Sequence, residues 1–248
     1  MTLAAERLSL VRGGATVLEG ASVELARGQL TAICGPNGAG KSSLLIALAG
    51  LLAPLSGSVQ LDGRPLAALH PRLRAQRLGY LPQEGEVAWD VAVENLVRLG
   101  RLPFRDRGDA AVEAAIAALD LAHLRQRSVS HLSGGEKARA LLARVLAGEP
   151  EWILADEPFA ALDLAHQQAL LRHLHDAAAQ GAGVVVVLHD LATAMNHADH
   201  VLVLSGGRVV AEGPPAVALS AETITRIWGV PMQWIGSPGP RGLVPAAG

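Results

Sequence analysis

The stretch TAICGPNGAGKSSLLIALAG, residues 31–50, decides the fold, because it passes from an apolar run through a glycine-rich turn into a leucine-rich helix. The turn matches the pattern G-x-x-x-x-G-K-[ST], with Gly35, Gly40, Lys41 and Ser42 at the specified positions. Backbone N–H groups of the turn and the N-terminus of the helix would converge on phosphate oxygens. Lys41 would reach the β- and γ-phosphates, and Ser42 would offer its hydroxyl to Mg²⁺. The stretch predicts a nucleotide site, and by itself it leaves open which class of protein carries it.

The composition excludes several classes. Half of the 248 residues are apolar and the formal net charge is −2, which disfavours a surface for nucleic acid, usually marked by a basic stripe. The only cysteine, Cys34, cannot form an internal disulfide and is interpreted as a small core residue in a reducing compartment. The opening MTLAAERLSL lacks the apolar run of a secretory signal, and the run LLIALAGLLAPL is too short to cross a bilayer. We expect a chain that is soluble by itself and reaches a membrane only through a partner.

Two apolar runs farther along the chain end in polar side chains. WILADEP places Asp156 and Glu157 directly after a buried strand, at the strand end where open α/β sheets bind ligands. Asp156 is expected to hold the Mg²⁺ shell and Glu157 to orient or deprotonate the attacking water. His189 ends VVVVLHD and is expected to contact the γ-phosphate or position that water; the alternative is a histidine that only caps a strand. The pair His197 and His200 has no evident third ligand, so no metal site is expected there.

A second helix start also fits phosphate. LSGGE, Leu132–Glu136, opens the amphipathic helix KARALLARVLAGEP, and Ser133 with two glycines offers a hydroxyl, N–H groups and a helix dipole. Two phosphate-binding helix starts are one more than a single ATP needs. Here the sequence resembles an ATP-binding cassette (ABC) ATPase, in which the signature of one subunit caps the ATP held by the phosphate loop of the other.

The resemblance covers nearly the whole chain, and the motifs stand in the family's order: phosphate loop, GYLPQ with Gln83, LSGGE, ILADEP, the ALD turn with Asp163, and His189. It implies a head-to-tail pair of chains with two ATP molecules and Mg²⁺ between them. It implies catalytic roles for Glu157, His189, Lys41 and Gln83, and Mg²⁺ ligands at Ser42, Gln83 and Asp156. It implies nucleotide contacts at Gly35, Pro36, Asn37, Gly38, Ala39, Gly40, Lys41, Ser42, Ser43, Ser133, Gly134, Gly135, Glu136 and Asp163.

Two positions depart from the family's pattern. Residues 1–79 contain no Phe, Tyr or Trp, whereas many cassettes stack adenine on an aromatic side chain of the first hairpin. LSLVRGGATVLEG places Arg12 at that position with Val17 as the second contact, and a guanidinium plane can stack on a base. Lys137 follows the signature where related chains often have Arg or Gln, and little consequence is expected.

The predicted fold is α/β, a single domain over residues 1–248. Strands alternating with helices indicate parallel βαβ units, and the resemblance implies a P-loop NTPase (RecA-like) core with an N-terminal antiparallel β subdomain and an inserted α-helical subdomain. The core takes residues 1–83 and 149–235, with a helix at about 165–180 and a hairpin in HVLVLSGGRVVAEG. The helical subdomain with the signature takes residues 84–148, and a flexible tail takes residues 236–248.

The resemblance also favours one kind of cassette. About fifty residues without sustained heptads separate Gln83 from Leu132, which disfavours the coiled-coil ATPases of repair and chromosome maintenance. A separate cassette without membrane spans is typical of bacterial importers. LGYLPQEGEVAWDVAVENLVRLGRLPF, ALDLAHQ and PAVALSAETITRIWGV are similar to the subfamily that imports iron-siderophores, haem and cobalamin. The expected partners are a second copy, transmembrane permease subunits and, through them, a substrate-binding protein, at the cytoplasmic face of the bacterial inner membrane, and not nucleic acid.

Three alternatives stay open at this point. The cassette could serve a zinc or manganese importer or an exporter. It could be a soluble ATPase that acts on nucleic acid, or a nucleotide-binding scaffold without turnover, against which Glu157 and His189 argue. Because the cassette does not touch the cargo, its sequence does not select one substrate.

Overall fold

The computed structural model describes residues 1–83, 90–160, 162–236 and 239–246. Residues 84–89 of the expected helical subdomain and residue 161 of the ALD turn lie outside the described residues. The strands are β1 Thr2–Arg12, β2 Ala15–Ala26, β3 Leu30–Cys34, β4 Ser56–Leu61, β5 Arg64–Pro65, β6 Leu78–Leu81, β7 Trp152–Asp156, β8 Gly183–Val187, β9 His200–Ser205, β10 Arg208–Gly213, β11 Met232–Ile235 and β12 Gly242–Pro245.

The α-helices are α1 Lys41–Leu48, α2 Pro71–Arg77, α3 Val93–Arg98, α4 Asp109–Ala118, α5 Gly134–Ala147, α6 Leu164–Ala179, α7 Leu191–His197, α8 Pro215–Ala218 and α9 Ala221–Trp228. Short 3₁₀ turns are η1 Leu66–Ala68, η2 Leu99–Arg101, η3 Ala122–Leu124 and η4 Val129–His131. The helix expected at about 165–180 is confirmed as α6.

A six-stranded sheet in the order β10-β9-β3-β8-β7-β6 forms the centre of the molecule. Its strands run parallel except β10, which pairs antiparallel with β9 as the expected hairpin. Every residue of β3, β7 and β8 is buried, because helices or a second sheet cover both faces, and this explains their unbroken apolar runs.

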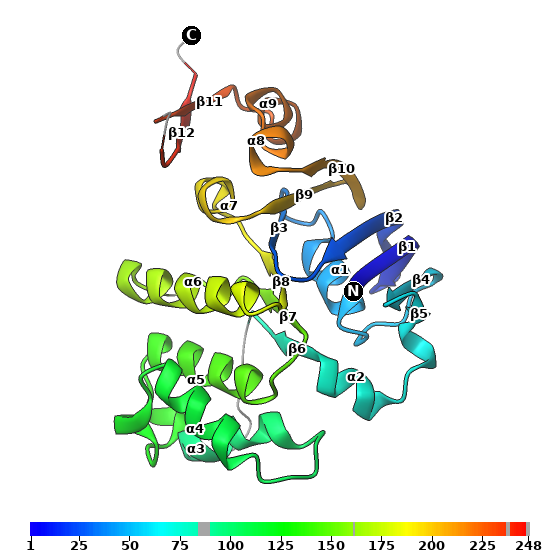
Figure 1. The fold of residues 1–248 in the computed structure, drawn as a ribbon. Helices are drawn as coiled ribbons and strands as arrows, with labels where there is room; N and C mark the ends of the chain where they lie inside the picture. Colours follow the sequence, from blue (N-terminus) through cyan, green and yellow to red (C-terminus); the bar gives the residue numbers. More distant parts are fainter. Residues whose placement is uncertain (84–89, 161, 237–238, 247–248) are drawn as a thin grey trace.

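The two faces of this sheet are covered differently. Helix α1 and the antiparallel sheet β2-β1-β4-β5 pack on one face, where Leu44 and Leu48 of α1 share a core with Leu8 and Leu18. Helices α6 and α7 pack on the other face (Figure 1). The predicted combination of a parallel core and an antiparallel β subdomain is confirmed.

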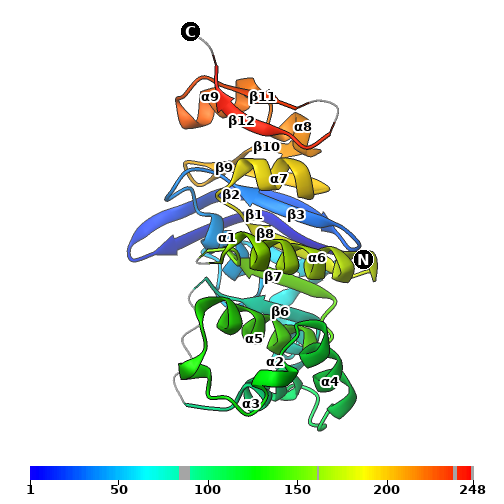
Figure 2. The same cartoon turned by 90° about the vertical axis from the view of Figure 1, so that its left-hand side faces the viewer.

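Helices α3, α4 and α5 pack on one another and form the helical subdomain. They lie at one end of the molecule, and the C-terminal elements β11, β12, α8 and α9 lie at the opposite end (Figures 1 and 2). Helix α5 connects this subdomain to the core, since β7 follows it directly.

The C-terminus differs from the expected flexible tail over residues 236–248. Part of it, Gly242–Pro245, forms β12 and pairs with β11. The side-chain amide of Asn196 in α7 donates to the carbonyl of Arg241 at 2.8 Å and accepts from its N–H at 2.7 Å. Trp234 of β11 donates through its indole nitrogen to the carbonyl of Leu219 at 2.7 Å. These hydrogen bonds join the hairpin to the core, and neither could be predicted from local composition.

Two sequence expectations concern burial and the membrane. Cys34 at the end of β3 is fully buried, and burial raises the pKa of its thiol to about 12, as fits a core residue. Among the described residues, no helix has both the length and the apolarity needed to cross a bilayer.

A substitution at Gly100 in η2 tests the packing of the helical subdomain. A methyl group at this position would lie 2.1 Å from the carbonyl oxygen of Arg144 in α5. We expect Gly100→Ala to force η2 and α5 apart and to lower the free energy of unfolding by about 1–3 kcal/mol, measured by urea denaturation. Gly242→Ala is the control, because its methyl group would lie 3.5 Å from the Ile235 side chain, in ordinary contact. Equal unfolding midpoints for the two variants would contradict this packing.

Candidate functional site

The phosphate loop begins where β3 ends, and two of its glycines are required by close backbone contacts. A methyl group on Gly35, whose φ is 150°, would lie 2.2 Å from the carbonyl oxygen of Leu204 in β9. A methyl group on Gly40, whose φ is 97°, would lie 2.5 Å from the carbonyl oxygen of Val17 in β2. The loop therefore fits between β2 and β9 only with glycine at both positions.

Lys41 is the first residue of α1, and its side chain folds back over the loop. Its Nζ donates to the carbonyl oxygens of Gly35 at 2.8 Å and Pro36 at 3.0 Å, and the residue is 5% exposed. Burial lowers the pKa of Lys41, and the nearby carboxylate of Glu157 opposes that shift. Helix α1 has no side-chain cap at Gly40, so its first N–H groups stay available to an anion.

Asp156 ends β7 beside the start of α1. The hydroxyl of Ser42 donates to its carboxylate at 3.0 Å, and Asp156 is 4% exposed. Burial raises the pKa of Asp156, while the hydrogen bond from Ser42 acts in the opposite direction. A carboxylate and a hydroxyl oxygen held together are the kind of hard donors that Mg²⁺ takes. The residues present therefore fit the cation that the sequence predicts here.

Glu157 follows Asp156 and lies between two other predicted site residues. The amide nitrogen of Gln83 donates to its Oε2 at 2.6 Å, and Nε2 of His189 contacts its Oε1. The Glu157 side chain is 13% exposed, whereas that of His189 is 49% exposed. Gln83, Glu157 and His189 follow β6, β7 and β8, three neighbouring strands, so sheet order alone brings them together.

The backbone at Glu157 supports a functional reading. Its φ is 47°, in the left-handed region that non-glycine residues seldom adopt. Such a conformation costs on the order of 1–3 kcal/mol, and residues held in it cluster at active sites and switch regions.

The signature residues form a second group with Asp163. Ser133 caps α5: its hydroxyl accepts from the N–H of Glu136 at 3.3 Å, and its own N–H donates to the Glu136 carboxylate at 2.7 Å. The hydrogen bond from the Ser133 N–H to this carboxylate lowers the pKa of Glu136. A methyl group on Gly135 would lie 3.3 Å from the imidazole of His166, so the signature faces the start of α6. Asp163 caps that helix by accepting from the N–H of His166 at 2.9 Å.

The structure therefore sorts the predicted residues into two groups. The loop, Asp156, Glu157, Gln83 and His189 form one, and the signature with Asp163 forms the other. Within the described ranges, no hydrogen bond or ion pair joins Ser133–Glu136 to the phosphate loop or to Glu157.

The predicted adenine contacts lie on the first hairpin. Arg12 ends β1, is exposed and pairs across the turn with Ala15, and the carbonyl of Val17 lies against Gly40. The roles of Arg12 and Val17 in holding adenine stay predictions.

Sequence reasoning missed some residues of the site. Tyr80 in β6 lies beside Asp156, and burial, with that carboxylate, raises its pKa to about 12, while Arg12 opposes the shift. His166 and Gln167 of ALDLAHQ shape the turn before α6, where Gln167 donates to the carbonyl of Leu162 at 3.0 Å. The triplet AHQ could have pointed to His166 and Gln167. Nothing in GYLPQ distinguishes Tyr80 from an ordinary strand residue.

Comparisons with known proteins identify the family of this chain. The family model described as ABC transporter matches residues 18–160. The hemin import ATP-binding protein HmuV of Nocardia farcinica is 45% identical, with 96% of this chain and 86% of the relative covered. HmuV of Pseudomonas aeruginosa is 46% identical, with 92% of each chain covered. A solved ABC transporter assigned to the metal-chelate type, in an inward-facing conformation, superposes with a TM-score of 0.84 at 28% identity, over 99% of this chain and 97% of that one. The chain therefore belongs to the ABC transporter family and is one of its ATPases.

Proposed function

We propose that this chain is the ATP-hydrolysing subunit of an importer for haem or a closely related metal chelate. The relatives named above, similar over most of their length, are hemin import proteins, and the similar transporter structure is of the metal-chelate type. Siderophores and cobalamin, which the sequence also allowed, have no such support.

The observation that carries the proposal is the position of the Glu157 carboxylate. It is held by Gln83 and His189 at the strand ends that also carry the phosphate loop. Positioned there, Glu157 orients a water molecule and accepts its proton as that water attacks the γ-phosphate. His189, whose side chain is more exposed than that of Glu157, would contact the terminal phosphate.

Ser42 and Asp156 are the residues that would hold Mg²⁺, with Gln83 as a further ligand. Gln83 donates to Glu157 through its nitrogen, so its amide oxygen is the atom available for the cation. When bound, Mg²⁺ supplies positive charge to the β- and γ-phosphate oxygens. Lys41 supplies a second positive charge by moving from the loop carbonyls to phosphate.

The separation of the two groups of residues supports a composite site. Ser133 and the glycines after it start the 14-residue helix α5, and a phosphate at that end would be stabilised by free N–H groups and the helix dipole. Because no hydrogen bond or ion pair among the described residues joins the signature to its own loop, we infer that it binds the ATP of a second copy, in a head-to-tail pair. Permease subunits at the cytoplasmic face of the inner membrane, and through them a substrate-binding protein, complete the assembly.

Glu157→Gln tests the catalytic assignment. Without its carboxylate the site loses the proton acceptor, so we expect steady-state ATP hydrolysis to fall by roughly 10²-fold or more, with ATP still bound. The matched control is Glu222→Gln in α9, a carboxylate far along the chain from the site, which should hydrolyse ATP normally. Undiminished hydrolysis by Glu157→Gln would refute the role of this residue.

The cargo is tested on the assembled transporter. We expect the chain to co-purify with its permease and ATP hydrolysis in liposomes to rise when haem-loaded binding protein is added. Binding protein loaded with cobalamin or a ferric siderophore should leave the rate unchanged. Stimulation by one of these ligands and not by haem would assign another cargo, and stimulation by nucleic acid without permease would contradict transport.

A further inference from the structure

A short segment ahead of α3 pairs with the residues that lead into the signature. Residues 90–94 lie antiparallel to residues 125–130, and we call this pairing the clasp. Its backbone hydrogen bonds run from the N–H of Val93 to the carbonyl of Arg127 at 3.0 Å, from Glu94 to Arg125 at 3.0 Å, and from Val129 to Val91 at 2.9 Å. The clasp ends three residues before Ser133, so it lies directly ahead of the start of α5.

The carboxylate of Asp90 closes one end of the clasp. It accepts hydrogen bonds from the hydroxyls of Ser130 at 2.6 Å and of Ser128, and the two hydroxyl oxygens lie 2.9 Å apart. Within residues 1–83, 90–160, 162–236 and 239–246, no arginine or lysine forms an ion pair with Asp90. Hydrogen bonds to an ionised acceptor are stronger than neutral ones, so this contact holds the turn at η4.

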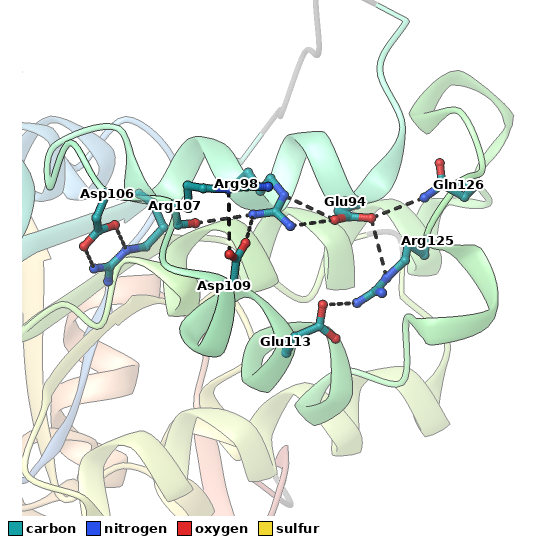
Figure 3. Close-up of polar contacts among 9 residues, drawn as sticks. Glu94, Arg98, Asp106, Arg107, Asp109, Glu113, Arg125 and Gln126 are labelled. Carbon is teal, nitrogen blue, oxygen red and sulfur yellow. Dashed lines mark hydrogen bonds and ion pairs between the residues drawn. The ribbon is translucent and has the colours of Figure 1, made fainter.

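Glu94 holds the other end of the clasp. Its carboxylate accepts from Arg98 at 2.8 Å and from Gln126 at 3.2 Å, and lies 3.7 Å from Arg125 (Figure 3). Arg125 is also contacted by Glu113 of α4. Single exposed ion pairs contribute little to stability. Here, however, Glu94 of α3 and Glu113 of α4 both contact Arg125.

Arg127 extends the clasp to the signature. Its backbone carbonyl accepts from Val93, and its guanidinium lies 3.7 Å from one carboxylate oxygen of Glu136. The other oxygen of Glu136 accepts from the N–H of Ser133. The residue that caps α5 is therefore connected to residues 90–94 by two successive side-chain contacts.

The residues before Gln83 are also connected to α5. The guanidinium of Arg144, in the last turns of that helix, donates to the carbonyl of Tyr80 in β6 at 3.1 Å. Tyr80 and residues 91–94 thus contact the signature helix or the residues leading into it.

We infer that Asp90 is a positioning residue for the signature: by holding Ser128 and Ser130, it fixes the turn at η4 that leads into Ser133. Ser133 serves the ATP of the second copy in the proposed pair, so a displaced turn at η4 would weaken that ATP site. The inference rests on the proposed two-copy site.

Asp90 and Ser130 are exposed, so their loss should cost little folding stability and should act on the position of α5. The test uses the Glu157→Gln chain, in which ATP remains bound, and compares it with chains that also carry Asp90→Ala, Asp90→Asn or Glu113→Ala. Glu113 is the matched control, because it contacts Arg125 from α4, outside residues 90–94 of the clasp. Sedimentation with and without ATP measures dimerisation, and ATP titration of the dilute monomer measures binding to the phosphate loop.

We expect Asp90→Ala to weaken ATP-dependent dimerisation by about tenfold, the loss of a hydrogen bond to a charged group, with monomer ATP binding and melting temperature unchanged. Asp90→Asn keeps an acceptor oxygen and should recover much of the loss, and Glu113→Ala should match the parent. Ser130→Ala is a milder change and should also weaken dimerisation. It replaces Asp90→Ala in the test if that variant does not fold.

Two results would overturn the inference while leaving the proposed function intact. One is dimerisation of Asp90→Ala and Ser130→Ala equal to that of the parent. The other is an equal loss in Glu113→Ala, which would reduce the effect to a general loosening of the subdomain. If the Glu157→Gln parent itself does not dimerise with ATP, the composite site fails and the inference fails with it.

Discussion

The site depends on one constraint, that the strands of the central sheet run parallel and end at one edge. The phosphate loop follows β3, Gln83 follows β6, Asp156 ends β7, and His189 follows β8. The order of the strands thus brings together residues that are more than a hundred positions apart in sequence. Strands β3, β7 and β8 are buried along their whole length, which restricts movement of their ends, and the Glu157 carboxylate lies between an amide and an imidazole.

Much of this arrangement could be predicted from the sequence, because it is encoded by short motifs at strand ends. The phosphate loop, the carboxylates of WILADEP and the helix start at LSGGE can each be recognised from residues that are neighbours in the sequence. The hairpin β11–β12 could not be predicted, since it is held by Asn196 and Trp234, whose partners are distant in sequence. Tyr80 was missed for the same reason, because only the fold brings it beside Asp156.

For some residues of the sequence motifs, only the structure shows why that residue type is needed. In LGR, Gly100 has no room for a side chain against the backbone of Arg144, and Arg101 forms ion pairs with Asp106 and Glu149. These residues fix how α5 leaves the helical subdomain. Together with Asp90 and Arg127, they make that subdomain a connected unit whose signature end and Gln83 end are held by specific contacts.

The central claim is that each ATP lies between the phosphate loop of one copy and the signature of the other. Two inactive chains test it directly, one with Lys41→Ala and one with Ser133→Arg, both also carrying Glu157→Gln. Alone, each should stay monomeric with ATP, because every site it could form lacks a loop or a signature. Mixed, they should form ATP-containing pairs with one intact composite site. A mixture as monomeric as its parts, under conditions where the Glu157→Gln chain dimerises, would contradict the account.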